Sequence, residues 1–223
     1  MLKARLPEKT KPDLNALLQE MNHRVRTYLS IIDSIIHLEK SINTSGKKDS
    51  LVLDNISSRI HAIALVHEKL CGSKNFNTVC IKDYIEGLAQ RLYKSHAVIP
   101  EHIIITVDAE PLFLDIDICV SLGIIITELI TNTFCHAFPK NESYQEKEKR
   151  VGISFFCENC MYKLMVKDNG IGFKKGIYIY RKKTLGLTLV KVLAEQLNGN
   201  FGIASEDETV FSIQFPIMKR IKQ

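Results

Sequence analysis

The chain has 223 residues, 45% hydrophobic and 25% charged, proportions typical of one large globular domain or two modest ones. The formal net charge of +5 is small for this length, and no block of like charge dominates, so nothing in it indicates nucleic-acid binding. Residues 1–15 lack the apolar segment of a signal peptide. The most apolar stretch, 117–130, contains Asp117 and Glu128 and is too short to span a bilayer. We therefore expect a cytosolic protein, or the cytosolic portion of a longer one.

The cysteines give little indication of a metal site. Of six, only Cys157 and Cys160, in the motif C-E-N-C, have the spacing of a zinc or redox pair. This motif lies between two strand-like runs, where a hairpin turn is expected. Without a second pair or a histidine partner it is a weak zinc signal, so we expect reduced thiols.

The first third of the chain has the heptad rhythm of packed helices. Between Asp13 and about Lys40, apolar or aromatic residues recur at alternating steps of four and three: Leu14, Leu18, Met21, Val25, Tyr28, Ile32 and Ile35. After a polar loop at 41–50, a second such series follows: Leu53, Ile56, Ile60, Ile63, His67 and Leu70. Two helices cannot enclose a core alone, so we expect the hairpin to pair with a second copy as a four-helix bundle.

From about residue 76 the pattern mixes helices with strands. Helices are expected at 83–96, 116–138 and 185–199, and strands at 102–109, 151–157, 161–168, 201–205 and 209–216. This order predicts an α+β sandwich, with a mixed sheet and helices on one face. We divide the chain into an N-terminal extension at 1–12, the helical hairpin at 13–75 and the α+β domain at 76–223.

Three polar residues are spaced four apart along the long apolar helix. Glu128, Asn132 and His136 therefore lie on one side of it. A carboxylate, an amide and an imidazole on an otherwise buried helix are costly unless they meet a ligand, an ion or water. The alternative is that this row faces solvent. Asparagine is a poor helix former, which favours the functional interpretation.

A glycine-containing segment follows the strand at 161–168. Gly170 and Gly172 come directly after Asp168 and permit tight turns and close approach of a ligand to the backbone. A loop with five basic residues follows at 174–184, and then Gly186 lies at the start of a helix, where free backbone amides suit phosphate. Each signal alone is common in ordinary turns, but their order along the chain is specific.

Three of these segments resemble the N, G1 and G2 boxes of the GHKL ATP-binding fold, which histidine kinases share with type II topoisomerases and mismatch-repair ATPases. They are "TELITNTFCHAF" at 127–138, "VKDNGIGF" at 166–173 and "TLGLTLV" at 184–190. The resemblance implies that the α+β domain binds ATP with Mg²⁺.

The hairpin resembles the dimerisation and phosphoacceptor module of sensor histidine kinases whose histidine is followed by arginine, the second HisKA type. The matching segments are "NHRVRTYLSIIDSIIHLEK" at 22–40 and "RIHAIALVHEKL" at 59–70. Together with the ATP-binding boxes, the resemblance extends from about residue 14 to residue 216. Other GHKL ATPases lack such a hairpin, so the combination is specific to histidine kinases.

The resemblance also implies residue roles at the phosphate end of the nucleotide. Asn132 would hold Mg²⁺ between phosphates, and Glu128 would be the acid/base or water-orienting carboxylate beside it. His136 would contact phosphate. A hard cation with oxygen ligands suits this set, because phosphoryl transfer needs mainly positioning and charge neutralisation.

At the other end of the nucleotide, the resemblance makes Asp168 the acceptor of a hydrogen bond from the adenine amino group. Gly170 and Gly172 would let the chain turn beneath the nucleotide. The G2 segment would bind phosphate at the helix start, through Thr184, Leu185 and Gly186. This segment has one glycine where the family usually has two.

The phosphoacceptor implied by the resemblance is His23, since neutral imidazole is a competent nucleophile. His23 lies opposite the apolar seam of the first helix, with Glu20 and Thr27 on the same strip and Arg24 next to it. We assign these four, with Glu128, to catalysis. The family usually has asparagine at the position of Thr27, a departure that bears on how any phosphatase activity would work.

The sequence therefore predicts a dimeric, cytosolic, ATP-dependent protein-histidine kinase that passes phosphate from His23 to an aspartate of a response regulator. Its input would come from a separate sensor protein or from a sensor segment of a longer chain, and neither nucleic acid nor membrane is expected as a partner. One alternative is a phosphotransfer protein whose nucleotide domain no longer binds ATP. The other is a GHKL ATPase or serine kinase that uses the hairpin only to dimerise.

Overall fold

A computed structural model describes residues 27–34, 36–37, 49–71, 77–95, 103–138, 148–172, 185–205 and 208–217. The chain divides into two units, residues 1–45 and 46–223. In the first unit, residues 27–34 and 36–37 are helical, within the predicted first helix. The predicted N-terminal extension lies outside the described residues, and the predicted domain boundary after residue 75 stays a prediction.

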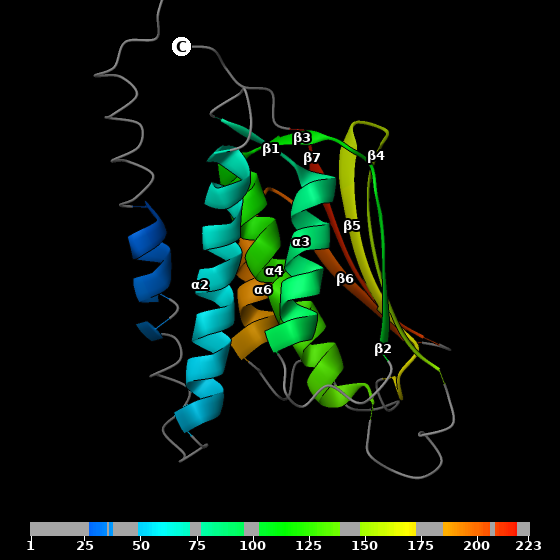
Figure 1. Ribbon diagram of the computed structural model, residues 1–223. Helices are drawn as coiled ribbons and strands as arrows, with labels where there is room; N and C mark the ends of the chain where they lie inside the picture. Colours follow the sequence, from blue (N-terminus) through cyan, green and yellow to red (C-terminus); the bar gives the residue numbers. More distant parts are fainter. Residues whose placement is uncertain are drawn as a thin grey trace, which may run out of the picture. The chain divides into compact units, whose positions relative to one another are not determined.

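A five-stranded mixed sheet forms one layer of the second unit (Figure 1). In spatial order its strands are β2 (Ile103–Ala109), β4 (Lys149–Glu158), β5 (Met161–Asp168), β7 (Thr209–Pro216) and β6 (Asn200–Ser205). The pair β2 and β4 is parallel, and the other three pairs are antiparallel. The predicted mixed sheet is confirmed, because each expected strand occurs within two residues of its predicted bounds.

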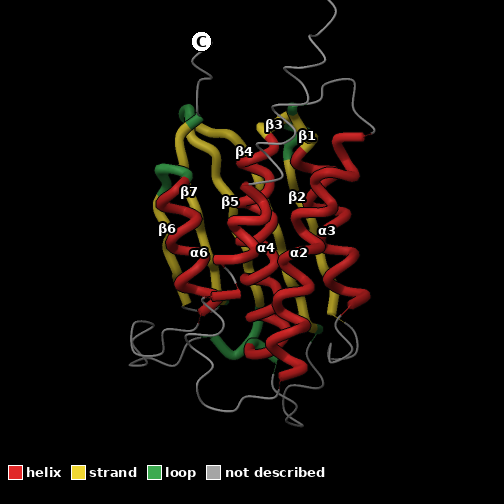
Figure 2. The backbone as a smooth tube through the Cα atoms, turned by 90° about the vertical axis from the view of Figure 1, so that its left-hand side faces the viewer, coloured by secondary structure: helices red, strands yellow, loops and turns green. Residues whose placement is uncertain are grey.

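The described helices of this unit cover one face of the sheet (Figures 1 and 2). They are α2 (Asp49–Cys71), α3 (Ile81–Ser95), α4 (Ile116–His136) and α6 (Leu185–Gln196). Alternate strand residues such as Phe155, Leu164 and Ile213 point into this layer and are fully buried. The α+β class with helices on one face is therefore confirmed.

A small second sheet was not predicted. β1 (Thr78–Cys80) directly precedes α3 in the chain, β3 (Phe113–Asp115) directly precedes α4, and the two strands pair antiparallel. Three residues are too few to display the two-residue alternation by which a strand is identified. The sheet ties together the starts of the two helices, since Ile81 N donates to Leu112 O at 2.9 Å.

Helix α4 is the central helix of the core. Asp115 caps its start, and its carboxylate accepts a hydrogen bond from Asp117 N at 3.4 Å. By length and composition α4 could cross a membrane, but 72% of its apolar window is buried inside this fold. Its apolar character is thus accounted for by packing between the sheet and the other helices.

The C-E-N-C motif forms the turn between β4 and β5, as predicted. Asn159 and Cys160 have positive φ of 51° and 60°, as both central residues of a type I′ hairpin turn must. Neither cysteine forms a disulfide; Cys160 is exposed and Cys157 is half-buried. Within the described ranges, no group of three or more His, Cys, Asp or Glu side chains could hold a metal ion.

Helix α2 packs on α4 and α3, on the side of α4 away from the sheet (Figures 1 and 2). Of the predicted seam residues, Ile63 and Leu70 are buried in this packing, whereas Leu53 is 65% and Ile60 38% exposed. α2 therefore buries one side within its own unit and presents apolar residues on another. The predicted dimer stays a prediction.

A hydroxyl group anchors α2 to the domain. Tyr84 of α3 donates from its hydroxyl to Ala62 O of α2 at 3.0 Å, and both residues are buried. The ring reaches α2 by passing Gly123 of α4, where an added Cβ would overlap the tyrosine hydroxyl. The absence of a side chain at residue 123 therefore lets three helices meet at one point.

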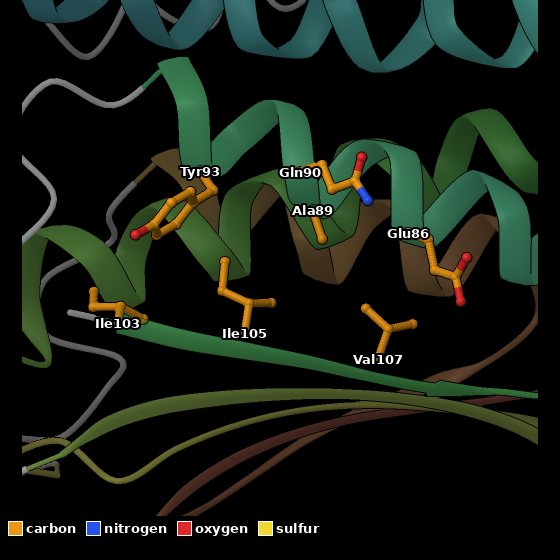
Figure 3. Close-up of a pocket in the computed structure, with 7 residues that line it drawn as sticks. All are labelled: Glu86, Ala89, Gln90, Tyr93, Ile103, Ile105 and Val107. Carbon is orange, nitrogen blue, oxygen red and sulfur yellow. The ribbon is translucent and has the colours of Figure 1, made fainter.

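A cavity of about 420 Å³ lies between α3 and β2. Figure 3 shows Ile103, Ile105 and Val107 of β2 pointing toward α3. Glu86 is the charged residue of its lining, and Tyr93 lies at the other end. Of the residues predicted for ATP binding, those that the structure describes do not line this cavity.

Replacing Gly123 with alanine is expected to destabilise the protein by about 1–3 kcal/mol, because the new methyl group must displace the Tyr84 ring. Chemical denaturation measures the change. Tyr84→Phe removes the nearest clashing atom, so the double variant should lose less than the sum of the single losses. As the control, Gly87→Ala adds a methyl at ordinary contact distance from Leu65 and should stabilise by about 0.4–1 kcal/mol. Equal losses at both glycines would contradict this explanation.

Candidate functional site

The predicted polar row lies on α4, facing the start of α6. Glu128 is buried at 7% exposure, Asn132 is half-buried one turn later, and His136 is exposed in the last turn. The remaining α4 side chains around Glu128 are mostly apolar and buried. The row therefore forms the polar edge of a core helix, and Glu128, its first residue, lies away from solvent.

The first turn of α6 lies directly against this row. A Cβ at Gly186 would be 2.5 Å from Glu128 Oε2 and 3.5 Å from Asn132 Nδ2. Only glycine permits this approach without displacing the carboxylate. The first amides of a helix have no intrahelical partners and carry the positive end of its dipole. A carboxylate, an amide side chain and a helix start thus come together here.

The side chain of Asn132 supports a bound group at this place. Its Nδ2 is buried and has no hydrogen-bond partner among the described residues. A buried donor without a partner costs free energy, which a phosphate oxygen would offset. Oδ1 of the same amide is the kind of ligand Mg²⁺ takes, and this ion usually binds few protein groups and keeps phosphate oxygens and water. The residues present therefore fit a Mg²⁺–phosphate group.

Asp168 ends β5 and is 3% exposed. Gly170 N donates to its Oδ1 at 3.0 Å, and Thr133 Oγ1 donates to its Oδ2 at 3.2 Å. Burial raises the pKa of this carboxyl above its ordinary value, helped by the negative charge of Glu208. Hydrogen bonds from Gly170, Thr133 and Thr209 act in the opposite direction without cancelling the rise.

The two glycines after Asp168 serve the turn in different ways. Gly170 packs so closely on Ala137, just after α4, that an added Cβ would overlap Ala137 O. Ile171 N donates to that same carbonyl at 2.9 Å. Gly172 has φ 65°, in the left-handed region that favours glycine. The turn therefore fixes the end of β5 to the end of α4.

These parts surround a cavity of about 150 Å³. It is lined by residues of α4 and its C-cap, β5, the glycine turn, α6 and β7: Asn132, Thr133, His136, Ala137, Asp168, Gly172, Leu187, Thr209 and Phe211. Asp168 is its buried carboxylate, and much of the remaining lining is apolar. A mostly apolar cavity with a buried carboxylate as acceptor suits a flat ring that carries an N–H donor.

The sequence did not reveal several residues of this cavity. Thr209 lies opposite Asp168 in the register of β5 and β7, so only strand pairing identifies it. Thr133 directly follows Asn132 and thus falls outside the four-residue spacing of the predicted row. Phe211 carries no local signal beyond that of an ordinary strand residue.

The sequence also missed Arg59, an arginine of α2 that is 2% exposed. Its Nε lies 2.5 Å from Glu128 Oε1, in a buried ion pair between α2 and α4. A signal was available, because Arg59 is spaced three and seven residues before Ala62 and Val66 on the buried side of the helix. A charge in line with an apolar strip indicates a buried partner.

The remaining predicted site residues are placed only in part. His23, Glu20, Arg24 and Thr184 lie outside the described residues. Thr27 begins the described helical segment of the first unit, and Leu185 is the first residue of α6. The structure thus brings together the predicted residues of α4, β5, the glycine turn and Gly186.

Comparison with known families gives two matches along the chain, and the first extends past the predicted end of the hairpin at residue 75 to include α3. Residues 20–96 match a family described as histidine kinase. Residues 119–219 match the histidine kinase-, DNA gyrase B- and HSP90-like ATPases. The second match spans the whole cavity, from α4 to β7.

Among curated proteins, the chain is 25% identical over 209 residues to the sensor histidine kinase PdtaS of Mycobacterium tuberculosis, covering 92% of this chain and 40% of that protein. It is 21% identical over 213 residues to blue-light-activated histidine kinase 2 of Erythrobacter litoralis, covering 93% and 59% respectively. The chain therefore spans about half the length of these relatives. A solved Erythrobacter litoralis histidine kinase domain has the same fold, with TM-score 0.64, 17% identity and coverage of 89% and 90%.

The raised pKa of Asp168 predicts how stability depends on pH. Because the folded state raises this pKa, the folded protein binds the proton more tightly than the unfolded chain. The stabilising contribution is therefore fully present below the unfolded pKa and is lost as pH rises through the folded one. Thermal melts of ligand-free protein should show the wild type losing stability relative to Asp168→Asn as pH rises from 4 to 7. A wild type that gains on the variant over this range would contradict the direction.

Proposed function

The chain belongs to the histidine kinases, and we propose that it is an ATP-dependent protein-histidine kinase that phosphorylates His23. A response regulator would then accept the phosphoryl group on an aspartate. The kinase would act as a homodimer in the cytosol, with input from a sensor protein or from a sensor segment of a longer chain.

One observation carries the proposal: a single helix, α4, joins a ring-sized cavity to a phosphate-compatible helix start. Asp168 and the cavity lie beside the last turns of α4, while Glu128 and Asn132 face Gly186 earlier along it. Asp168 would accept a hydrogen bond from the adenine amino group. Asn132 and the first amides of α6 would hold the phosphates, with His136, Thr184 and Leu185 beside them.

Asn132 would bind Mg²⁺, which neutralises phosphate charge when present. A neutral imidazole nitrogen of His23 would attack the γ-phosphorus of ATP, forming an N–P bond as the P–O bond to ADP breaks. Glu128 would accept the proton that the imidazole gives up or orient the attacking ring. Glu20, Arg24 and Thr27 would surround His23 on the exposed side of its helix.

Phosphorylation should occur on His23. Incubating the purified chain with radiolabelled Mg·ATP is expected to give a protein-bound phosphate that is stable in base and lost in acid, as phosphohistidine is. His23→Gln should abolish the label, because glutamine lacks the nucleophilic ring nitrogen. His37→Gln is the control, since His37 is an exposed histidine of the described helical segment, where it pairs with Asp33 at 3.8 Å.

Three results would contradict the proposal. An acid-stable product would indicate a serine or threonine acceptor, which favours the serine kinase alternative. Undiminished label on the His23→Gln variant would exclude His23 as the acceptor. Absence of both label and nucleotide binding would favour the phosphotransfer protein with an inactive nucleotide domain.

Asp168→Asn should weaken nucleotide binding, measured by calorimetric titration with ADP so that no phosphoryl transfer intervenes. Loss of a hydrogen bond to a charged acceptor costs about 1.5–3 kcal/mol, or roughly 10- to 100-fold in the dissociation constant. Glu86→Gln is the matched control, because Glu86 is the carboxylate of the other cavity (Figure 3). Equal weakening by both variants would place the nucleotide elsewhere.

A further inference from the structure

Arg59 occupies a position that stability alone does not explain. Among the described residues it is the only lysine or arginine that is buried, and it extends from α2 into the base of the candidate site. Removing a charge from water is costly, and a buried ion pair often contributes no more to stability than an apolar pair of similar volume. Its consequence for the structure is therefore the orientation it gives to Glu128.

The carboxylate of Glu128 is held between two helices. Oε1 lies 2.5 Å from Arg59 Nε on α2, while Oε2 lies 2.5 Å from the point that a Cβ of Gly186 would occupy on α6. Asn132 Nδ2 lies 3.5 Å from that same point. Arg59 thus binds Oε1 from the α2 side, and Oε2 faces the start of α6, where phosphate would bind.

The guanidinium group suits this task. It is planar and remains charged, and its Nε–H has a fixed direction, so it defines the orientation of a carboxylate more narrowly than an ammonium group does. Without it, Glu128 would be a buried carboxylate free to turn toward Asn132. A displacement of about 1 Å in a reacting group is enough to lower a rate roughly 100-fold.

We propose that Arg59 is a positioning residue for phosphoryl transfer, which holds Glu128 in its reactive orientation and makes that orientation depend on the docking of α2. This inference rests on the proposed kinase function and extends it. Arg59 acts through Glu128 and does not itself contact ATP.

The packing around Arg59 gives α2 this influence. Ala62, three residues later on the same buried side, accepts a hydrogen bond at its carbonyl oxygen from the Tyr84 hydroxyl, so polar contacts hold α2 to the α+β domain at both residues. A shift of α2 relative to α4 would disturb both. α2 also belongs to the predicted phosphoacceptor hairpin, so its position would reach the nucleotide site through a single side chain.

The test compares Arg59→Met with Arg91→Met, the same substitution at an exposed arginine of α3. Arg59→Met should lower the rate of phosphohistidine formation at saturating Mg·ATP by roughly 10- to 100-fold. The dissociation constant for ADP should change by less than about threefold, because neither Arg59 nor Glu128 lines the cavity. Arg91→Met should change neither quantity. A structural defect would instead weaken binding and rate together.

Two further variants show whether Arg59 acts through Glu128. The Glu128→Gln variant lacks the carboxylate that Arg59 is proposed to orient. In that background, Arg59→Met should cause no additional loss of rate. Arg59→Lys keeps the charge without the planar group and should give a rate between those of wild type and Arg59→Met. If Arg59→Met alone fails to fold, the cause would be the Glu128 carboxylate, left buried without its partner. The Arg59→Met/Glu128→Gln double variant removes that charge, and its rate is compared with that of Glu128→Gln.

Three results would overturn the inference while leaving the kinase function intact: an unchanged rate in Arg59→Met, a loss that persists in the Glu128→Gln background, or a parallel loss of ADP binding. A wild-type chain that forms no phosphohistidine would contradict the proposed function itself. The two failures are therefore distinguishable in one set of measurements.

Discussion

The structure depends on the double role of α4, which is both the centre of the core and one wall of the candidate site. Nearly every side of the helix is buried, so a polar group on it destabilises the fold unless it has a hydrogen-bond or ion-pair partner. Two elements provide such partners, Arg59 of α2 for Glu128 and the end of β5 for Thr133, whereas Asn132 Nδ2 beside the start of α6 has none among the described residues. The contacts that satisfy Glu128 and Thr133 therefore also assemble the site, and Asn132 is left for a ligand.

Local patterns predicted the larger elements because each extends over several periods of its own repeat. The strands at 161–168 and 209–216 match in full, and α6 ends at Gln196, three residues before its predicted limit, just ahead of Asn198 with its positive φ of 55°. β1 and β3 were missed because three residues carry no period, and their pairing depends on residues more than thirty positions apart. Strand order and the packing side of α2 are equally long-range, and no local pattern encodes them.

The candidate site divides in the same way. Glu128, Asn132 and Asp168 could be predicted because each is a polar residue in an apolar setting or beside glycine. Thr209 and Arg59 could not be assigned a role, since the first acts through strand register and the second through helix packing. Sequence thus identifies groups that would contact a ligand more readily than the groups that hold them in place.

The energetics of the ligand-free site follow from this division. Asp168 is buried deeply enough to raise its pKa, and Asn132 Nδ2 is a buried donor with no partner among the described residues. Both features destabilise the protein alone, and both are removed by a ligand that donates to the carboxylate and accepts from the amide. Glu128 differs, because Arg59 already satisfies it before any ligand binds. Asp168 and Asn132, the groups proposed to contact nucleotide, would therefore gain from binding, whereas Glu128, the proposed acid/base group, already has its partner on α2.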